Sequence, residues 1–430
     1  MPQRGSADTP KEPAARPALA RRLGTADAVL IGLGSMVGAG VFAVWAPAAR
    51  AAGNGLLIGL PLAGVVAYCN AASSAQLAAV YPVSGGTYVY GRERLGPWWG
   101  FAAGWAFVIG KTASSAAMAL TLASYAVPGE GDELVRRMVA LTAVVALAAV
   151  NYRGITRTAA LTRVLVGCSL AVLALVVVVL LAGGEPSGAR LTEGSTSVYG
   201  VLQAGGLLFF AFAGYARIAT MGEEVRDPSR TIPRAVTIAL AVAAGIYLVV
   251  ALCLLLTRPA AQVAMSADPL AAAVDAAGAA AAVPVVRIAA ALASLGALLA
   301  LIAGIGRTSL AMARERDLPR WLSAVHERFG VPHHAELALA VVVGVLVLTT
   351  DLRGVLGFSS FGVLLYYAIA NTSAFTQPPD QRRWPRAVNV LGLTGCLVLA
   401  FSLPVASVLA GAAVLTAGLA GRFVVLRRRR

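Results

Sequence analysis

Residues 32–40 read Gly32-Leu33-Gly34-Ser35-Met36-Val37-Gly38-Ala39-Gly40, four glycines in nine positions of an apolar run that extends over 26–48. Glycine in a helix interior costs about 1 kcal/mol relative to alanine. We therefore expect the helix to unwind here and to leave backbone N–H and C=O groups free for a ligand. The alternative is that these glycines only allow helices to pack closely.

A second glycine-rich run lies in the apolar segment 198–220. It contains Gly205-Gly206 and then Phe210-Ala211-Phe212-Ala213-Gly214-Tyr215. The two runs fall in the first and sixth apolar segments. The two segments are five helices apart. Because five is an odd number, the sixth segment enters the membrane from the side opposite to the first. This spacing predicts an inverted repeat, 26–182 against 198–376, with helix breaks in corresponding positions.

The composition is that of a membrane protein, because 58% of the residues are hydrophobic and only 13% are charged. A bilayer-spanning helix needs roughly 20 apolar residues, and long continuous runs favour helices over barrel strands. The sequence predicts an all-α integral membrane protein of about twelve transmembrane helices. Their expected ranges are 26–48, 56–80, 97–126, 134–151, 159–182, 198–220, 233–257, 284–308, 335–350, 354–376, 387–403 and 404–426.

The net charge of +15 is a topology signal, not a sign of nucleic-acid binding. An even number of helices puts both termini on one side, and most lysines and arginines fall on that side. It is therefore expected to be the cytoplasmic side of the cell membrane. Residues 1–22 are expected to be a disordered cytoplasmic tail, 23–376 the core that contains both repeats, and 377–430 two peripheral transmembrane helices with a basic end. Seven arginines fall on the opposite side: Arg50, Arg136, Arg137, Arg190, Arg258, Arg287 and Arg353.

Residues that could form a metal or catalytic centre are scattered. Each of the four cysteines falls in a different apolar segment, and the three histidines lie together in one loop. We therefore expect no metal, no prosthetic cofactor and no enzymatic activity.

Four stretches resemble the amino acid–polyamine–organocation superfamily of secondary transporters. The longest covers the sixth apolar segment and the charged loop that follows it, and the others are shorter. The resemblance implies a LeuT-like fold with helices 1 and 6 broken, and transport of amino acids or related amines. The four stretches are 37–42, 79–90 with Gly104-Trp105, 209–234 and 307–319.

The resemblance also indicates where the substrate lies. The α-carboxylate would be held by backbone N–H groups of the first break, and the ammonium group by carbonyls of the sixth helix. An aromatic residue of helix 6 would close over the substrate; each of these rings could equally be packing filler. The implied substrate-binding residues are Val37, Gly38, Ala39, Gly40 and Val41, with Phe210, Ala211, Phe212, Ala213, Gly214 and Tyr215.

Lys111 and Ser169 are the candidates for ion coupling. Lys111 lies near mid-depth in its segment, where a charge is costly and usually functional. It could fill a cation site or carry a proton, or it could snorkel without titrating. The helix 5 lysine of proton-coupled relatives aligns with Ser169. Between Ser294 and Thr308 the eighth helix lacks the hydroxyls that sodium coupling would need, which favours proton symport or exchange.

The loop after the sixth segment is expected to help gate the cytoplasmic vestibule through Glu223, Glu224, Arg226 and Asp227. The alternative is an ordinary capped connection, with Pro233 in the first turn of the next helix. The lack of an acidic side chain near mid-depth favours neutral amino acids over cationic ones. A transporter of polyamines or other organic amines, and an amino-acid sensor that transports nothing, remain open alternatives.

Overall fold

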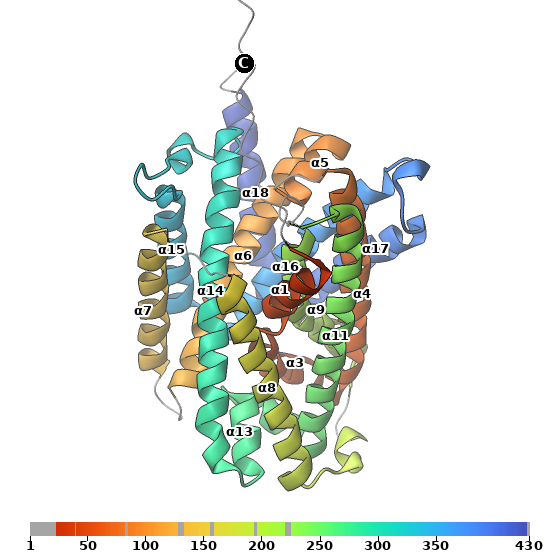
Figure 1. The fold of residues 1–430 in the computed structure, drawn as a ribbon, viewed down its shortest axis with the longest axis vertical. Helices are drawn as coiled ribbons and strands as arrows, with labels where there is room; N and C mark the ends of the chain where they lie inside the picture. Colours follow the sequence, from red (N-terminus) through yellow and green to blue (C-terminus); the bar gives the residue numbers. More distant parts are fainter. Residues whose placement is uncertain are drawn as a thin grey trace, which may run out of the picture.

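The computed structural model describes residues 23–38, 40–81, 85–127, 133–154, 159–192, 196–219 and 225–427. These residues form a helical bundle whose long helices run along one common direction (Figure 1). Each of the twelve predicted spans coincides with one helix or a closely spaced group of helices. In chain order these are α1–α3 (Thr25–Met36, Gly40–Ala43, Trp45–Ala52), α4 (Leu56–Val80), α6 (Pro97–Ala126), α7 (Glu133–Tyr152), α8 (Ala159–Gly183), α9–α10 (Val198–Phe212, Ala216–Ala219), α11 (Pro228–Thr257), α14 (Val283–Arg314), α15 (His333–Thr349), α16 (Leu352–Phe375), α17 (Arg386–Ser402) and α18 (Val405–Arg427).

Within the described ranges, nine helical stretches are long and apolar enough to cross a bilayer, and α15 and α17 are shorter apolar helices. In hydrocarbon a helix satisfies its backbone hydrogen bonds internally, which is why such sequences fold this way. The prediction of an all-α membrane protein is confirmed. The exact inverted repeat and the domain boundaries stay predictions.

Two predicted helix boundaries are wrong. The helix expected over 233–257 begins five residues earlier, with Pro228 in its first turn and Pro233 inside it. The helix expected to end at 308 continues to Arg314. In both places the chain leaves the apolar run but stays helical, so hydropathy cannot detect the extension. Three short helices lie in predicted loops: α5 (Thr87–Leu95), α12 (Ala260–Met265) and α13 (Pro269–Ala276).

The end of the bundle that carries α5 and the C-terminus is held by a buried ion-pair cluster. Asp317, just after α14, pairs with Arg422 of α18, and their side chains are only 6% and 8% exposed. Its second oxygen accepts a hydrogen bond of 2.8 Å from Tyr88 and lies 3.5 Å from Arg92, both in α5. Burial and the bond to Asp317 raise the pKa of Tyr88, which therefore stays a neutral donor. One carboxylate thus joins α5, α14 and α18.

A buried polar network joins α17 to the core. Asn371 of α16 donates to Asn70 of α4 (2.6 Å) and accepts from Ser73 (2.7 Å). Asn389 of α17 donates to Ser73 at 2.7 Å, and the Cys396 thiol of α17 contacts the Asn70 amide oxygen at 3.1 Å. Hydrogen bonds between helices substitute for the water that lipid lacks. No spacing pattern in the sequence predicts this network, because its members are about 300 residues apart.

Candidate substrate site

The first membrane segment is interrupted where its glycines cluster. Helix α1 ends at Met36, and the Val37 N–H still bonds to Leu33 O. Helical structure resumes at Gly40 in α2 and continues through α3 after a bend at Val44. Ala39 lies outside the described residues. The expected interruption of the first helix is therefore present between Met36 and Gly40.

The sixth segment changes its geometry without fully unwinding. Helix α9 ends at Phe212, a 3-10 turn covers Ala213–Tyr215, and α10 follows directly. The Ala213 N–H is shared between the carbonyls of Phe209 and Phe210. A tightened turn thus takes the place of the open break that the sequence predicts.

The two irregular segments lie against each other. A Cβ at Gly214 would strike the Ser35 carbonyl and approach Met36 N to 2.6 Å, and a Cβ at Gly40 would lie 2.8 Å from Ala211 Cα. A clash with backbone atoms cannot be relieved by a rotamer change of a side chain. The glycines are therefore required by the contact between the first and sixth segments, the two segments that are expected to form one site.

Two tyrosine hydroxyls donate hydrogen bonds to backbone carbonyls at this contact. Tyr247 of α11 donates to Ala211 O at 3.0 Å, and Tyr125 of α6 donates to Phe42 O at 3.3 Å. Both tyrosines are buried, and their rings pack edge-on against Phe212 (5.1 Å) and Phe42 (5.7 Å) respectively. Neither tyrosine could be recognised from the sequence, because an aromatic residue in an apolar run is typical of ordinary helix packing.

The aromatic residues predicted to cover the substrate have different surroundings. Phe212 and Tyr215 are fully buried, whereas Phe210 is half-buried. The Tyr215 ring lies 5.1 Å from Tyr367 of α16, next to the polar network around Asn70. The described packing gives Phe212 and Tyr215 structural contacts, and their role in closing over a substrate stays a prediction.

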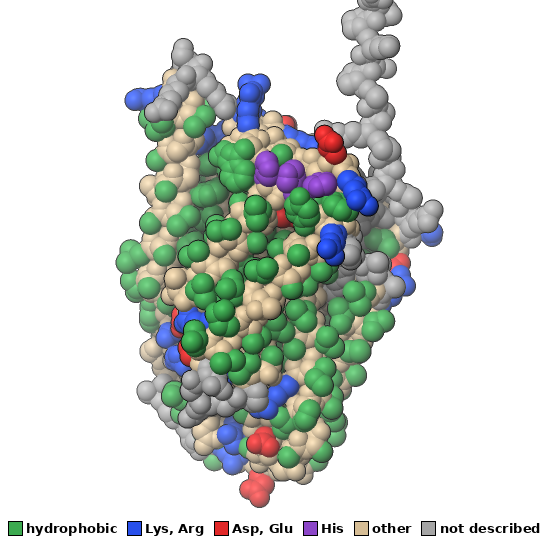
Figure 2. All heavy atoms as spheres, turned by 90° about the vertical axis from the view of Figure 1, so that its left-hand side faces the viewer, with side chains coloured by type: hydrophobic (Ala, Val, Ile, Leu, Met, Phe, Trp, Pro, Cys, Tyr) green, Lys and Arg blue, Asp and Glu red, His purple; other side chains and the backbone are tan. Residues whose placement is uncertain are grey.

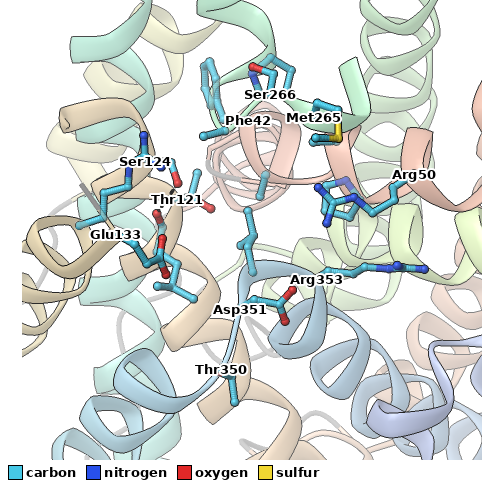
Figure 3. A pocket seen from close by; sticks show the side chains of 18 of the residues that line it. Phe42, Arg50, Thr121, Ser124, Glu133, Met265, Ser266, Thr350, Asp351 and Arg353 are labelled. Atoms are coloured by element: carbon cyan, nitrogen blue, oxygen red, sulfur yellow. Dashed lines mark hydrogen bonds between the residues drawn. The ribbon is translucent and has the colours of Figure 1, made fainter. Parts of the chain in front are cut away.

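A cavity of about 250 Å³ lies beside α2 and α3, and the Phe42 side chain is part of its lining (Figure 3). Residues from α2, α3, α6, α7, α16 and the segment between α12 and α13 line it. Its described lining contains four arginines and two acids, with the hydroxyls of Thr121 and Ser124. The charged residues are Arg50, Glu133, Arg136, Arg137, Asp351 and Arg353.

Several of these charges already have partners. Arg137 pairs with Glu133 at 2.8 Å, and Arg353 donates to Gln203 of α9 at 2.7 Å. Arg50 donates to Ala264 O at 3.0 Å, and Asp351 caps α16 by accepting from the Gly354 N–H. The cavity is thus a polar space whose charged side chains are held by hydrogen bonds and ion pairs. It reaches Phe42 and Ala43 of α2, which follow the helix interruption.

The two coupling candidates lie in α6 and α8. No described residue gives the Lys111 ammonium a hydrogen bond or an ion pair, and Phe107 one turn away packs 5.2 Å from Tyr366 of α16. Ser169 is buried within α8. The structure does not test either residue as an ion site.

Of the predicted gate, Arg226 and Asp227 are described, whereas Glu223 and Glu224 lie outside the described residues. Asp227 adopts a left-handed backbone conformation (φ 47°) immediately before α11 and lies 3.9 Å from Arg230. The Arg226 N–H donates to Leu23 O at 2.9 Å, which ties this segment to the chain just before α1. Gating by these residues stays a prediction.

The long apolar helices and the interrupted first helix define a multi-pass membrane protein of the transporter class. Residues 23–420 match the family described as amino acid permease, and the chain belongs to this family. It is accordingly a transporter and not an enzyme.

Three relatives illustrate the similarity. An uncharacterized transporter of Mycobacterium tuberculosis is 57% identical over 96% of this chain and 93% of its own length. The branched-chain amino acid permease BcaP of Bacillus subtilis is 25% identical over 89% of this chain and 86% of its own length. The human cationic amino acid transporter 4 is 29% identical over 83% of this chain and 59% of its own length.

Proposed function

We propose that the protein is a secondary active transporter that moves neutral amino acids across the cytoplasmic membrane by proton symport or exchange. Both termini lie in the cytoplasm in this proposal, so that the cavity beside α2 faces outward. The substrate's carboxylate binds the backbone at residues 37–41, and its ammonium group binds carbonyls of residues 210–213.

The observation that carries the proposal is the contact between the interrupted first helix and the 3-10 turn at Ala213–Tyr215. At a helix end, backbone groups lack their usual partners within the helix. Two such ends meeting in hydrocarbon offer donors and acceptors that suit a zwitterion. Tyr247 donates to one lone pair of Ala211 O in the described conformation, and an ammonium group would use the second lone pair of this carbonyl.

The preference for neutral substrates is supported by the charge of the cavity. Its described lining contains more arginines than acids, so a substrate with an additional positive charge meets no excess of carboxylates. A relative is named as a cationic amino acid transporter and another as a methylthioribose transporter. The test must therefore include such compounds.

The test is counterflow in proteoliposomes loaded with an unlabelled candidate and supplied with the same labelled compound outside. The panel contains all amino acids, polyamines and methylthioribose. We expect neutral amino acids to accumulate and to compete with one another. Binding in a thermal-shift assay without accumulation would instead support a sensor, and accumulation of only an amine would overturn the proposed substrate class.

Replacement of Lys111 by methionine tests the coupling ion. We expect Lys111→Met to flatten the pH dependence of uptake, because a half-buried amine near mid-depth, with no described hydrogen-bond or ion-pair partner, is an ionisable group that can exchange a proton. Thr112→Val is the matched control, since the Thr112 hydroxyl bonds only to Val108 O of its own helix. An unchanged pH profile in Lys111→Met with normal folding would remove Lys111 from the coupling mechanism.

A further inference from the structure

A large apolar groove lies on the membrane-facing surface, separate from the cavity beside α2 in most of its lining. Its volume is about 940 Å³, and α6, α14, α15, α16 and α18 form its walls. Figure 2 shows the surface hollowed between α18 and the body of the molecule, with hydrophobic side chains along the hollow. Val108, Ile305, Leu339, Phe358 and Ala410 represent the five walls.

The groove exists because α18 stands away from the bundle. Only 6% of its apolar window is buried. It is held along one edge by the hydrogen bonds Ser407 Oγ to Gly354 O (3.1 Å) and Trp105 Nε1 to Val414 O (2.9 Å). Toward α15 it presents Ala406 and Ala410, side chains too small to fill the space.

The charged groups of the groove gather at one end. Arg137, Thr349, Thr350 and Asp351 lie there, whereas the remaining walls are largely apolar. Arg137 uses Nε for Glu133 and Nη1 for the Val347 carbonyl, and no described residue bonds its Nη2. Asp351 uses Oδ1 for the Gly354 N–H, and no described residue bonds its Oδ2. This end therefore offers a free donor and a free acceptor of opposite charge.

We propose that the groove is a binding site for one phospholipid whose headgroup contains both a phosphate and an ammonium group. The acyl chains lie along α15 and α18, the phosphate binds Arg137, and the ammonium group binds Asp351. From Ala335 to Thr349 the groove follows α15 for about 21 Å, at 1.5 Å per residue. One leaflet supplies about half of a hydrocarbon core that is roughly 30 Å thick, so an acyl chain fits within this length.

The choice of lipid comes from the polar end. Hydrocarbon gains little by moving from the bilayer into an apolar groove, since both surroundings are apolar. Water is a poor occupant of most of the groove, because the largely apolar walls give it few hydrogen-bond partners. The headgroup contacts therefore determine which lipid stays bound. Arg137, Thr350 and Asp351 also line the cavity beside α2, so the headgroup would lie at the border of that cavity.

The first test measures the phospholipid that remains on protein purified in mild detergent, by native mass spectrometry. We expect about one phospholipid per wild-type chain and none on Ala410→Phe, in which the ring fills the groove. Ala413→Phe is the matched control, because Ala413 is exposed on α18 but does not line the groove. Equal retention by Ala410→Phe and wild type, both folded by thermal melting, would overturn the site.

The second test needs no variant. Delipidated wild-type protein is titrated with phosphatidylethanolamine or phosphatidylglycerol while its melting temperature is followed. We expect a saturable rise with phosphatidylethanolamine and a smaller one with phosphatidylglycerol, which lacks the ammonium group. An equal or larger rise with phosphatidylglycerol would contradict the headgroup assignment. A dimer that Ala410→Phe disrupts, with no lipid retained by wild type, would identify a second copy of this chain as the occupant instead.

Discussion

Gly214→Ala is expected to abolish uptake and to lower the melting temperature of the purified protein. The added methyl group would strike the Ser35 carbonyl and Met36 N, which are backbone atoms of the interrupted first helix. Overpacking costs about 1–3 kcal/mol where side chains can adjust. Here the two segments must separate instead, and this disturbs the proposed substrate site directly. The measurements are uptake in proteoliposomes and thermal melting by intrinsic fluorescence.

Gly245→Ala provides the control for this substitution. Gly245 lies inside α11, and a Cβ there would meet nothing within 4 Å. Alanine at an unstrained helical position is expected to stabilise the fold by about 0.4–1 kcal/mol. The two glycine substitutions should therefore change the melting temperature in opposite directions. Normal uptake by Gly214→Ala would show that the close contact is not needed for transport.

Asp317→Asn is expected to destabilise the protein by about 3–5 kcal/mol, the usual cost of removing one partner from a buried ion pair. The side chain of Arg422 is only 8% exposed and would lose its carboxylate. The asparagine amide keeps one neutral acceptor oxygen and cannot serve Arg422, Tyr88 and Arg92 together, so α5 and α18 loosen together. A denaturant or thermal unfolding series in a fixed detergent measures the loss.

Glu315→Gln is the matched control on the same turn. Glu315 lies 3.5 Å from Arg92, but its side chain is 56% exposed. Exposed pairs contribute about 0–1 kcal/mol, so this variant should behave almost like wild type. Similar losses for Asp317→Asn and Glu315→Gln would mean that burial does not govern the strength of this cluster.

The membrane spans could be predicted from the sequence because hydrocarbon imposes a length and a polarity on each helix. The ranges 56–80 and 97–126 agree with α4 and α6 in the structure. Helix α14 was predicted to end too early, because its last turns leave the apolar run. Their buried residue Met312 packs against Tyr88 and Phe101 rather than against lipid.

The candidate site was predicted only in part. Glycine clusters indicated where the first and sixth helices become irregular, and the structure brings both regions into contact. The hydroxyls of Tyr125 and Tyr247 could not be assigned from sequence, because their acceptors lie in distant segments. The ligand roles of residues 37–41 and 210–215, the inverted repeat and the coupling residues remain predictions.

The network around Asn371 has a consequence for how the chain is assembled during synthesis. Asn70 and Ser73 enter the membrane with α4, but their partners in α16 and α17 follow about 300 residues later. Until then these polar groups depend on water, neighbouring helices or the insertion machinery for hydrogen bonds. A chain that terminates before α17 would keep Ser73 without Asn389. Docking of the C-terminal helices is thus a late step of biogenesis, at which quality control can recognise an unfinished protein.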